Sequence, residues 1–285
     1  YGLFYVNYNT ASNQNTNIGC RVLFMGQLPA SIPGPNTEGL GTINFGATWR
    51  RLAARTRPST LPQRGGVGTV VRLKGGSLSC MKRAKNLYQQ LISEDNLRRA
   101  ILEVNHTHRY HAHHKINRTV ARVDANIDLY VARLRDIFDH GYEATAPRMA
   151  RRWDKSAGKW RDISEPRLWP DQYVHHAVIQ VLEPVMMRGM DPYCCGSIRG
   201  RGIHYGVRAI KKWLRTDQKG TRCAEELDIH HFYDSLTTET VMNRLKQLVK
   251  DRRMLDTCER LMKYSVLIGA YFSQWFANTV LQPLD

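Results

Sequence analysis

The sequence predicts a helix-rich α+β fold that follows a poorly structured N-terminal segment. Apolar residues recur at helical spacing through most of the chain after Met81, and only short stretches carry strand patterns. Residues 1–80 hold one acidic residue, Glu38, and eight basic ones, and Gly, Pro, Thr, Ser and Asn dominate there. Such a composition is typical of a disordered segment or of irregular loops. We therefore divide the chain into residues 1–80 and 81–285.

The elements expected after Met81 follow from the spacing of apolar residues and from turn signals. Two helical segments are expected between Leu87 and Leu102, with Ser93 or Asp95 capping the second. A helical pattern then runs from Val120 to Phe138 and stops at Gly141. The remaining predictions are two strands within 142–166 around a turn at 154–159, a strand over 223–229, and helices over 171–190, 204–215, 237–250, 254–267 and 273–284.

The charge balance points to a polyanionic partner. The 285 residues include 42 Lys and Arg against 25 Asp and Glu, a net charge of +17. Nucleic acid is the usual partner of such a chain, and a basic protein that merely stays soluble is the alternative. No apolar run is long enough to span a membrane. The six cysteines form no CxxC pair, which favours a reducing, cytoplasmic location.

The first candidate site lies at the end of the strand predicted over 223–229. Asp228 is followed by Ile229 and, after two histidines, by the aromatic pair Phe232 and Tyr233. A carboxylate at a strand end and the neighbouring backbone carbonyl of Ile229 supply the hard oxygen ligands that Mg²⁺ prefers. A bulky ring at Tyr233 could lie under a sugar and exclude a 2′-hydroxyl. The alternative is that Asp228 caps a turn and both rings belong to the core.

The second candidate segment runs from Ile268 to Asn278. Gly269 marks a turn, Ser273 is expected to cap the following helix, and that helix is rich in aromatic residues. Together with the Asp228 segment it resembles reverse transcriptases: the first segment is similar to the block with the first catalytic aspartate, and the second to the block before the paired-aspartate strand. This resemblance implies that Gly269 and Ser273 contact nucleic acid and that Gln274 contacts the nucleotide.

Two further stretches are similar to blocks of the same family. The segment 159–166, followed by Asp171, resembles the fingers block, which implies that Arg161 holds nucleotide phosphates and that Lys159 assists. The segment 197–204 resembles the next block, a basic loop near template and nucleotide. Taken singly, each could equally be a solvated basic turn. In this order, the four blocks extend the resemblance over residues 82–285.

Arg199 and Arg201 are the nucleic-acid contacts that the resemblance implies in segment 197–204. It further implies the fingers and partial palm of a right-hand polymerase that performs RNA-directed DNA synthesis. Its requirements are Mg²⁺, an RNA template, a DNA primer and dNTPs. The variant from Ile268 to Gln274, Ile-Gly-x-x-x-Ser-Gln, looks like diversity-generating retroelements. That type implies a small basic accessory protein and a bacterial or phage-encoded origin.

The family's paired aspartates have no counterpart in the sequence, because neither Asp234 nor Asp285 stands in a matching position. We expect the chain to be a fragment that is inactive in primer extension, with an aromatic-x-Asp-Asp hairpin encoded just downstream. The alternatives are a group II intron-type reverse transcriptase or maturase and a non-catalytic nucleic-acid-binding module. A phage lectin-like binding protein is a third, based on residues 1–30 alone.

Two other patterns carry weaker hypotheses. The Asn-rich stretch 5–22 is similar to the end of lectin-like variable proteins, so residues 1–30 could be a translated template repeat before a natural start at Met81, or simply a loop or flexible arm. The histidine run 106–114 lacks cysteine partners and standard zinc spacing, so an RNA-facing basic segment is favoured over a metal site. The Lys- and Arg-rich segment 211–215 could track phosphates or be a solvated helix face.

Overall fold

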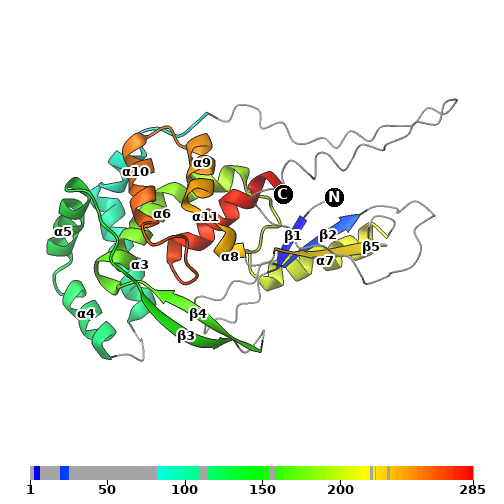
Figure 1. Ribbon diagram of the computed structural model, residues 1–285, viewed down its shortest axis with the longest axis horizontal. Coiled ribbons are helices and arrows are strands. Elements are labelled where there is room, and N and C mark those ends of the chain that lie inside the picture. The colour runs from blue at the N-terminus through cyan, green and yellow to red at the C-terminus, as the bar shows by residue number, and fades with distance from the viewer. Residues whose placement is uncertain are drawn as a thin grey trace. The chain divides into compact units, whose positions relative to one another are not determined.

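Figure 1 shows the computed structural model, which describes residues 3–6, 20–25, 82–109, 114–154, 158–218, 221, 223–229 and 232–284. Helices account for most of these residues, and the strands form two small sheets. The predicted α+β class is confirmed at this level. The assignment to polymerase fingers and palm remains a prediction.

The core is built around helix α6, Tyr173–Met186 (Figure 1). Eleven of its 14 residues are buried. A helix buried on most of its faces belongs in the interior, which explains why apolar residues occur on nearly all sides of this segment. Its neighbours are α3 (Glu94–His108) and α11 (Tyr271–Leu281), and α9 (Thr238–Leu248) packs on α11.

Two of the outer helices, α3 and α9, begin at polar caps, and the sequence predicted the cap of α3. Ser93 accepts a hydrogen bond from the backbone N–H of Asn96 at the start of α3, and Thr237 accepts one from Thr240 at the start of α9. Gly141, at φ 85°, follows His140, the C-cap residue of α5. The other helices of this layer are α2 (Leu87–Leu91), α4 (His114–Asp124), α5 (Ile127–Asp139) and α10 (Arg252–Leu261).

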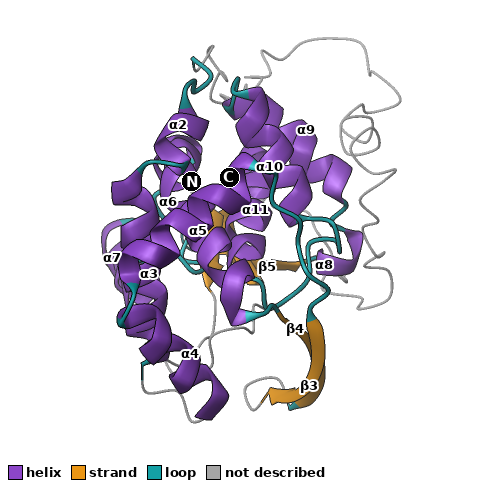
Figure 2. Cartoon of the chain, turned by 90° about the vertical axis from the view of Figure 1, so that its left-hand side faces the viewer, coloured by secondary structure: helices purple, strands orange, loops and turns teal. Residues whose placement is uncertain are grey.

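The predicted hairpin is confirmed as strands β3 (Arg148–Asp154) and β4 (Lys159–Glu165). They pair antiparallel, with Trp153 opposite Trp160 and Arg151 opposite Asp162. Residues 155–157 of the predicted turn lie outside the described residues. Figure 2 shows the hairpin extending away from the helices.

The strand that ends in Asp228 is β5, Cys223–Asp228, as expected. It pairs antiparallel with β2 (Cys20–Met25), which pairs in turn with β1 (Leu3–Val6). Both partner strands fall within residues 1–80, for which the composition predicted disorder or irregular loops. Other residues of that segment, and the division at residue 81, lie outside what the structure describes.

Three boundaries differ from the sequence prediction. The pattern from Val120 to Phe138 is split into α4 and α5 around Ala125 and Asn126. The helix expected over 254–267 ends at Leu261, and Ser265 has a positive φ of 73°. The last long helix begins at Tyr271, two residues earlier than predicted.

The remaining helices are α7 (Ile203–Thr216), the short α8 (Phe232–Ser235) and the turns η1 (Leu168–Gln172), η2 (Met187–Gly189) and η3 (Gln282–Leu284). Among the described helices, none is both long and apolar enough to cross a membrane.

Candidate functional site

The turn before α11 lies directly against β4, so two of the predicted blocks are in contact. The backbone N–H of Ser164 donates to the carbonyl of Ile268 at 2.7 Å. Gly269 adopts φ +115°, and a Cβ placed on it would lie 2.1 Å from the carbonyl oxygen of Ser164. Only glycine combines this backbone conformation with this approach. The glycine of the 268–278 segment is therefore required by packing against the β3–β4 hairpin.

The base of the hairpin is held by Asp171, the last residue of the predicted fingers block. Its buried carboxylate accepts hydrogen bonds from the Tyr142 hydroxyl at 2.5 Å, from the Thr145 hydroxyl and from the Thr145 backbone N–H at 3.3 Å. These donors lie on the segment that leads into β3, so Asp171 fixes where the hairpin leaves the helices. Burial, and then the bond to Asp171, raises the pKa of Tyr142.

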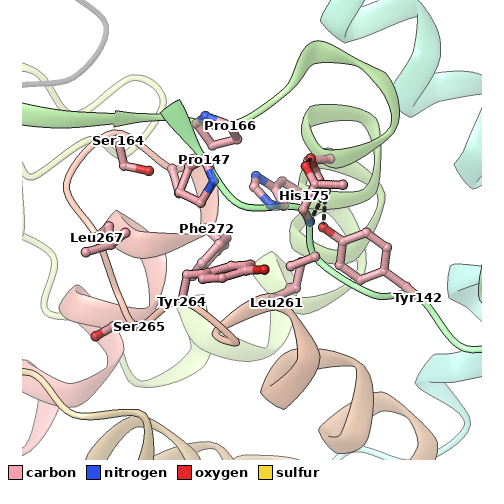
Figure 3. A pocket seen from close by; sticks show the side chains of 14 residues that line it. Tyr142, Pro147, Ser164, Pro166, His175, Leu261, Tyr264, Ser265, Leu267 and Phe272 are labelled. Atoms are coloured by element: carbon pink, nitrogen blue, oxygen red, sulfur yellow. Dashed lines mark hydrogen bonds between the residues drawn. The ribbon is translucent and has the colours of Figure 1, made fainter. Parts of the chain in front are cut away.

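A small hollow lies between this base and the turn before α11 (Figure 3). Its volume of about 30 Å³ has room for a water molecule or two but not for a nucleotide. His175 lines it and meets Phe272 edge-on, with ring centroids 4.9 Å apart. Complete burial lowers the pKa of His175 to about 3, so its imidazole is neutral. The hollow is therefore a small gap in the packing between the hairpin base and the turn before α11.

Arg161, the predicted phosphate ligand, is engaged by a carboxylate of its own hairpin. Its Nε donates to Asp154 Oδ2 at 2.7 Å, and the two side chains are only 13% and 4% exposed. Its Nη2 is buried without a hydrogen-bond partner among the described residues. The Nη2 donors thus remain for a ligand, but the charge is already paired. The side chain of Lys159 lies outside the described residues.

The predicted basic loop at 197–204 is fastened to the helices. The guanidinium of Arg199 pairs with Glu103 of α3, which raises the pKa of Arg199, although 80% of the Arg199 side chain is exposed. Arg201 Nη1 donates to the carbonyl of Asp191 at 2.9 Å. Asn278 of α11 donates to the carbonyl of Gly196 at 2.6 Å.

The first turn of α11 packs its aromatic side chains on α6. Tyr271 stacks on His176, with ring centroids 3.8 Å apart and planes 7° apart. Burial lowers the pKa of His176 to about 4 and raises that of Tyr271 to about 12. Ser273 was predicted as the helix cap, and this is wrong: the N-cap is Ala270. The Ser273 hydroxyl is buried inside the helix without a hydrogen-bond partner among the described residues, and the next side chain, Gln274, is half-buried.

The structure describes Asp228 by its backbone, as the last residue of β5. Tyr233 lies in α8, half-buried against the core, with its ring 5.4 Å from that of Phe232. That the Tyr233 ring lies under a nucleotide sugar remains a prediction.

The resemblance implies Mg²⁺ at Asp228, and a metal ion there needs several oxygen ligands. One carboxylate and the carbonyl of Ile229 have the right chemistry, but two oxygens fall short of the near-octahedral shell that Mg²⁺ requires. Among the described residues, no three His, Cys, Asp or Glu side chains gather closely enough to hold a metal ion. One carboxylate and one backbone carbonyl do not by themselves form a two-metal site.

The structure thus joins three of the four blocks through α11. The turn before it touches β4 through Gly269 and Ser164, and Asn278 bonds the carbonyl of Gly196, which directly precedes the loop at 197–204. Sequence reasoning missed Tyr142, Thr145 and Asp154, whose roles depend on partners in other segments. For Asp154, the signal was its position on the same hairpin face as Arg161, because both alternate with the exposed tryptophans.

The remaining candidates are only partly described. In the histidine run, His108 bonds the Val104 carbonyl at 3.0 Å through Nδ1, whereas residues 110–113 lie outside the described residues. On α7, Lys211, Lys212 and Arg215 are exposed, which fits either a phosphate-tracking or a solvated face.

Comparison with known proteins gives one informative similarity, and no protein-family model matches the chain. The chain is 31% identical over 112 residues to Nuclear intron maturase 1, mitochondrial, of Arabidopsis thaliana. These residues make up 39% of this chain but only 15% of the maturase, so the chain spans a small part of that relative's length. The similarity supports a relationship to group II intron-type proteins and gives no specific support to the diversity-generating type.

Proposed function

We propose that the chain is the fingers and early palm part of a group II intron-type reverse transcriptase or maturase, and that it binds RNA. The observation that carries this proposal is the contact of Gly269 with Ser164. Two blocks that resemble parts of one reverse-transcriptase site, far apart in the sequence, meet there at a position where only glycine fits. The similarity to an intron maturase supports the same relationship independently.

An RNA partner agrees with the charge of the chain. The net charge of +17 favours a polyanion, and Arg199 is exposed enough to reach a phosphate beside its own carboxylate partner. The proposed roles of template, DNA primer and dNTPs follow from the family resemblance. Within this proposal, Arg161, Gln274 and Tyr233 contact the nucleotide, and Asp228 with the Ile229 carbonyl provides the first metal ligands.

A diversity-generating retroelement enzyme is the second candidate. The variant segment from Ile268 to Gln274 and the Asn-rich stretch 5–22 favour it, and it would add a small basic accessory protein as partner. The maturase similarity favours the intron type. Sequencing of cDNA copied from a defined RNA separates them, because errors concentrated at template adenines support the retroelement and uniformly low errors support the intron type.

Two measurements test the proposal. The purified chain should bind single-stranded RNA in a salt-dependent manner, as measured by fluorescence anisotropy, and Arg199→Ala should weaken binding. When the chain is expressed together with the reading frame that follows it, Asp228→Ala should abolish dNTP incorporation. Asp234→Ala is the matched control, a carboxylate six residues further on that should leave incorporation intact. Equal activity of both variants would overturn the assignment of Asp228.

A further inference from the structure

One face of the β3–β4 hairpin exposes large apolar side chains together. Because Trp153 stands opposite Trp160 and Arg151 opposite Asp162, alternation along the strands places all four on one face, with Met149 beyond them. The side chains of Met149, Trp153 and Trp160 are 54%, 45% and 56% exposed. The other exposed large apolar residues of the described chain lie outside the hairpin, on α3, α5, α7 and the loop at Tyr264.

Exposure of such an apolar face to water costs free energy unless a partner covers it. Tryptophan is among the residues most strongly buried on average, and a cluster of exposed apolar side chains marks an interaction site more often than scattered ones do. The opposite face of the same hairpin behaves differently, because it carries the buried Asp154 and Ile163. The exposed tryptophans are therefore a property of one face and not of a hairpin that is solvated throughout.

A cation lies beside the two rings and indicates the kind of partner that they suit. The guanidinium of Arg151 lies 5.8 Å from the centre of the Trp160 ring. Arg151 is the cation on the face that carries the rings, and it stands opposite Asp162. Three of the other strand cations, Arg148, Arg152 and Arg161, lie on the opposite face and pair with Glu165 or Asp154. Aromatic rings beside cations are the combination that binds single-stranded nucleic acid, because bases stack on the rings while cations attract the backbone.

The arrangement of the rings favours unpaired bases over a duplex. The rings of Trp153 and Trp160 lie 5.4 Å apart with their planes at 66°, so they present faces in different directions. Two splayed bases can each use one of them, whereas the bases inside a duplex expose no free face. The platform also leads toward the candidate site, since Ser164 lies on the same face four residues after Trp160, roughly 13 Å along the strand.

We propose that Arg151, Trp153 and Trp160 form a stacking platform for unpaired bases of single-stranded RNA. The platform rests on the proposed RNA-binding function and extends it, because it assigns a binding surface that reaches beyond the four blocks to Arg151 and Trp153. An RNA strand held there would enter beside the contact between Ser164 and Gly269.

The test compares the affinities of the chain for a short fluorescein-labelled oligouridylate and for a duplex RNA of equal length. The Trp153→Leu/Trp160→Leu double variant should bind the single strand at least about tenfold more weakly, with little change for the duplex. Phe at both positions should restore most of the affinity. Leu129→Ala, which changes an exposed apolar residue on α5, is the matched control and should have no effect. Circular dichroism melting confirms that each variant is folded.

Salt dependence separates stacking from charge. The double Leu variant should shift the line of log affinity against log salt without changing its slope, whereas Arg151→Gln should make the slope shallower. Unchanged single-strand affinity of the double variant, while the wild type binds RNA, overturns the platform and leaves the proposed function standing. Failure of the wild type to bind RNA overturns both. A wild-type dimer that becomes monomeric in the double variant at unchanged RNA affinity shows that the face is a self-association surface, and this also overturns the platform.

Discussion

Asp154 and Arg161 form a buried ion pair across the β3–β4 hairpin, with 2.7 Å between Arg161 Nε and Asp154 Oδ2. The residue that resembles the family's phosphate ligand is thus held by a carboxylate of the same hairpin. Because both charges are removed from water, each depends on the other. A phosphate that reaches Arg161 has to use the remaining donors or displace Asp154.

Asp154→Asn should destabilise the chain by about 2–4 kcal/mol, because it leaves the Arg161 guanidinium buried without its counter-ion. Urea unfolding at neutral pH gives the free energy. Glu165→Gln is the matched control on the same hairpin: Glu165 pairs with the exposed Arg152, and its loss should cost no more than about 1 kcal/mol. Similar losses for both variants would show that the Asp154 pair is solvated.

Gly269→Ala should cost about 2–5 kcal/mol, because the new Cβ would collide with the Ser164 carbonyl and the φ of +115° is strained for alanine. Gly158→Ala separates the two causes. Gly158 also has a positive φ, +60°, but a Cβ there meets nothing within 4 Å, so the expected loss is only about 1–2 kcal/mol. Chemical denaturation of both variants measures the difference, and equal losses would contradict the steric argument.

Tyr142→Phe should lower the free energy of unfolding by about 1–3 kcal/mol, because it removes a hydrogen bond to the buried carboxylate of Asp171. Tyr264→Phe provides the comparison. Tyr264 lines the same hollow but is 40% exposed, so loss of its hydroxyl should change stability by less than about 0.5 kcal/mol. If the two variants have the same stability, Asp171 does not anchor the hairpin base through Tyr142.

Stability should fall with acid because two histidines are buried in the neutral form. Burial lowers the pKa of His176 to about 4 and that of His175 to about 3, whereas the unfolded chain titrates near the ordinary value of 6.5. Between these values the unfolded state binds more protons, so stability is complete above about pH 6.5 and decreases toward about pH 4. Each histidine contributes up to about 3 kcal/mol to this decrease.

Urea unfolding across this pH range measures the dependence. His176→Phe keeps a ring against Tyr271 and removes one titrating group, so the decrease should become smaller. His106→Gln, an exposed histidine on α3, should leave the profile of the wild type unchanged. A His176→Phe profile that matches the wild type would mean that His176 is accessible to protons in the folded chain.

The sequence predicted local structure well where a period or a turn signal was strong. The β3–β4 hairpin, α6 and the strand before Asp228 were all expected from their patterns. The split at Asn126 and the early start of α11 were missed because apolar spacing continues through both boundaries. Ser273 resembled a cap because serine often starts helices, but Ala270 begins this one, and the helix turns the serine into the core.

The candidate site was predictable as a set of segments and not as a set of contacts. The order of the motifs indicated that Gly269 and Arg161 belong to the candidate site. It could not show that Gly269 is needed for its approach to Ser164, or that Arg161 is bound to Asp154, because both facts depend on how distant or cross-strand segments pack. The role of Asp171 was hidden for the same reason, since its donors precede it by more than two dozen residues.

Helix α11 is fixed along its whole length. Gly269 anchors the turn before it to β4, Asn278 bonds the carbonyl of Gly196, and the buried Arg244 of α9 donates to the carbonyl of Thr279 at 3.1 Å. Elements that are attached to the same buried helix are expected to unfold as one cooperative unit. Amide hydrogens of β4, of the loop around Gly196 and of α9 should therefore exchange with solvent in a single cooperative step, and loosening any one attachment should speed exchange at the other two.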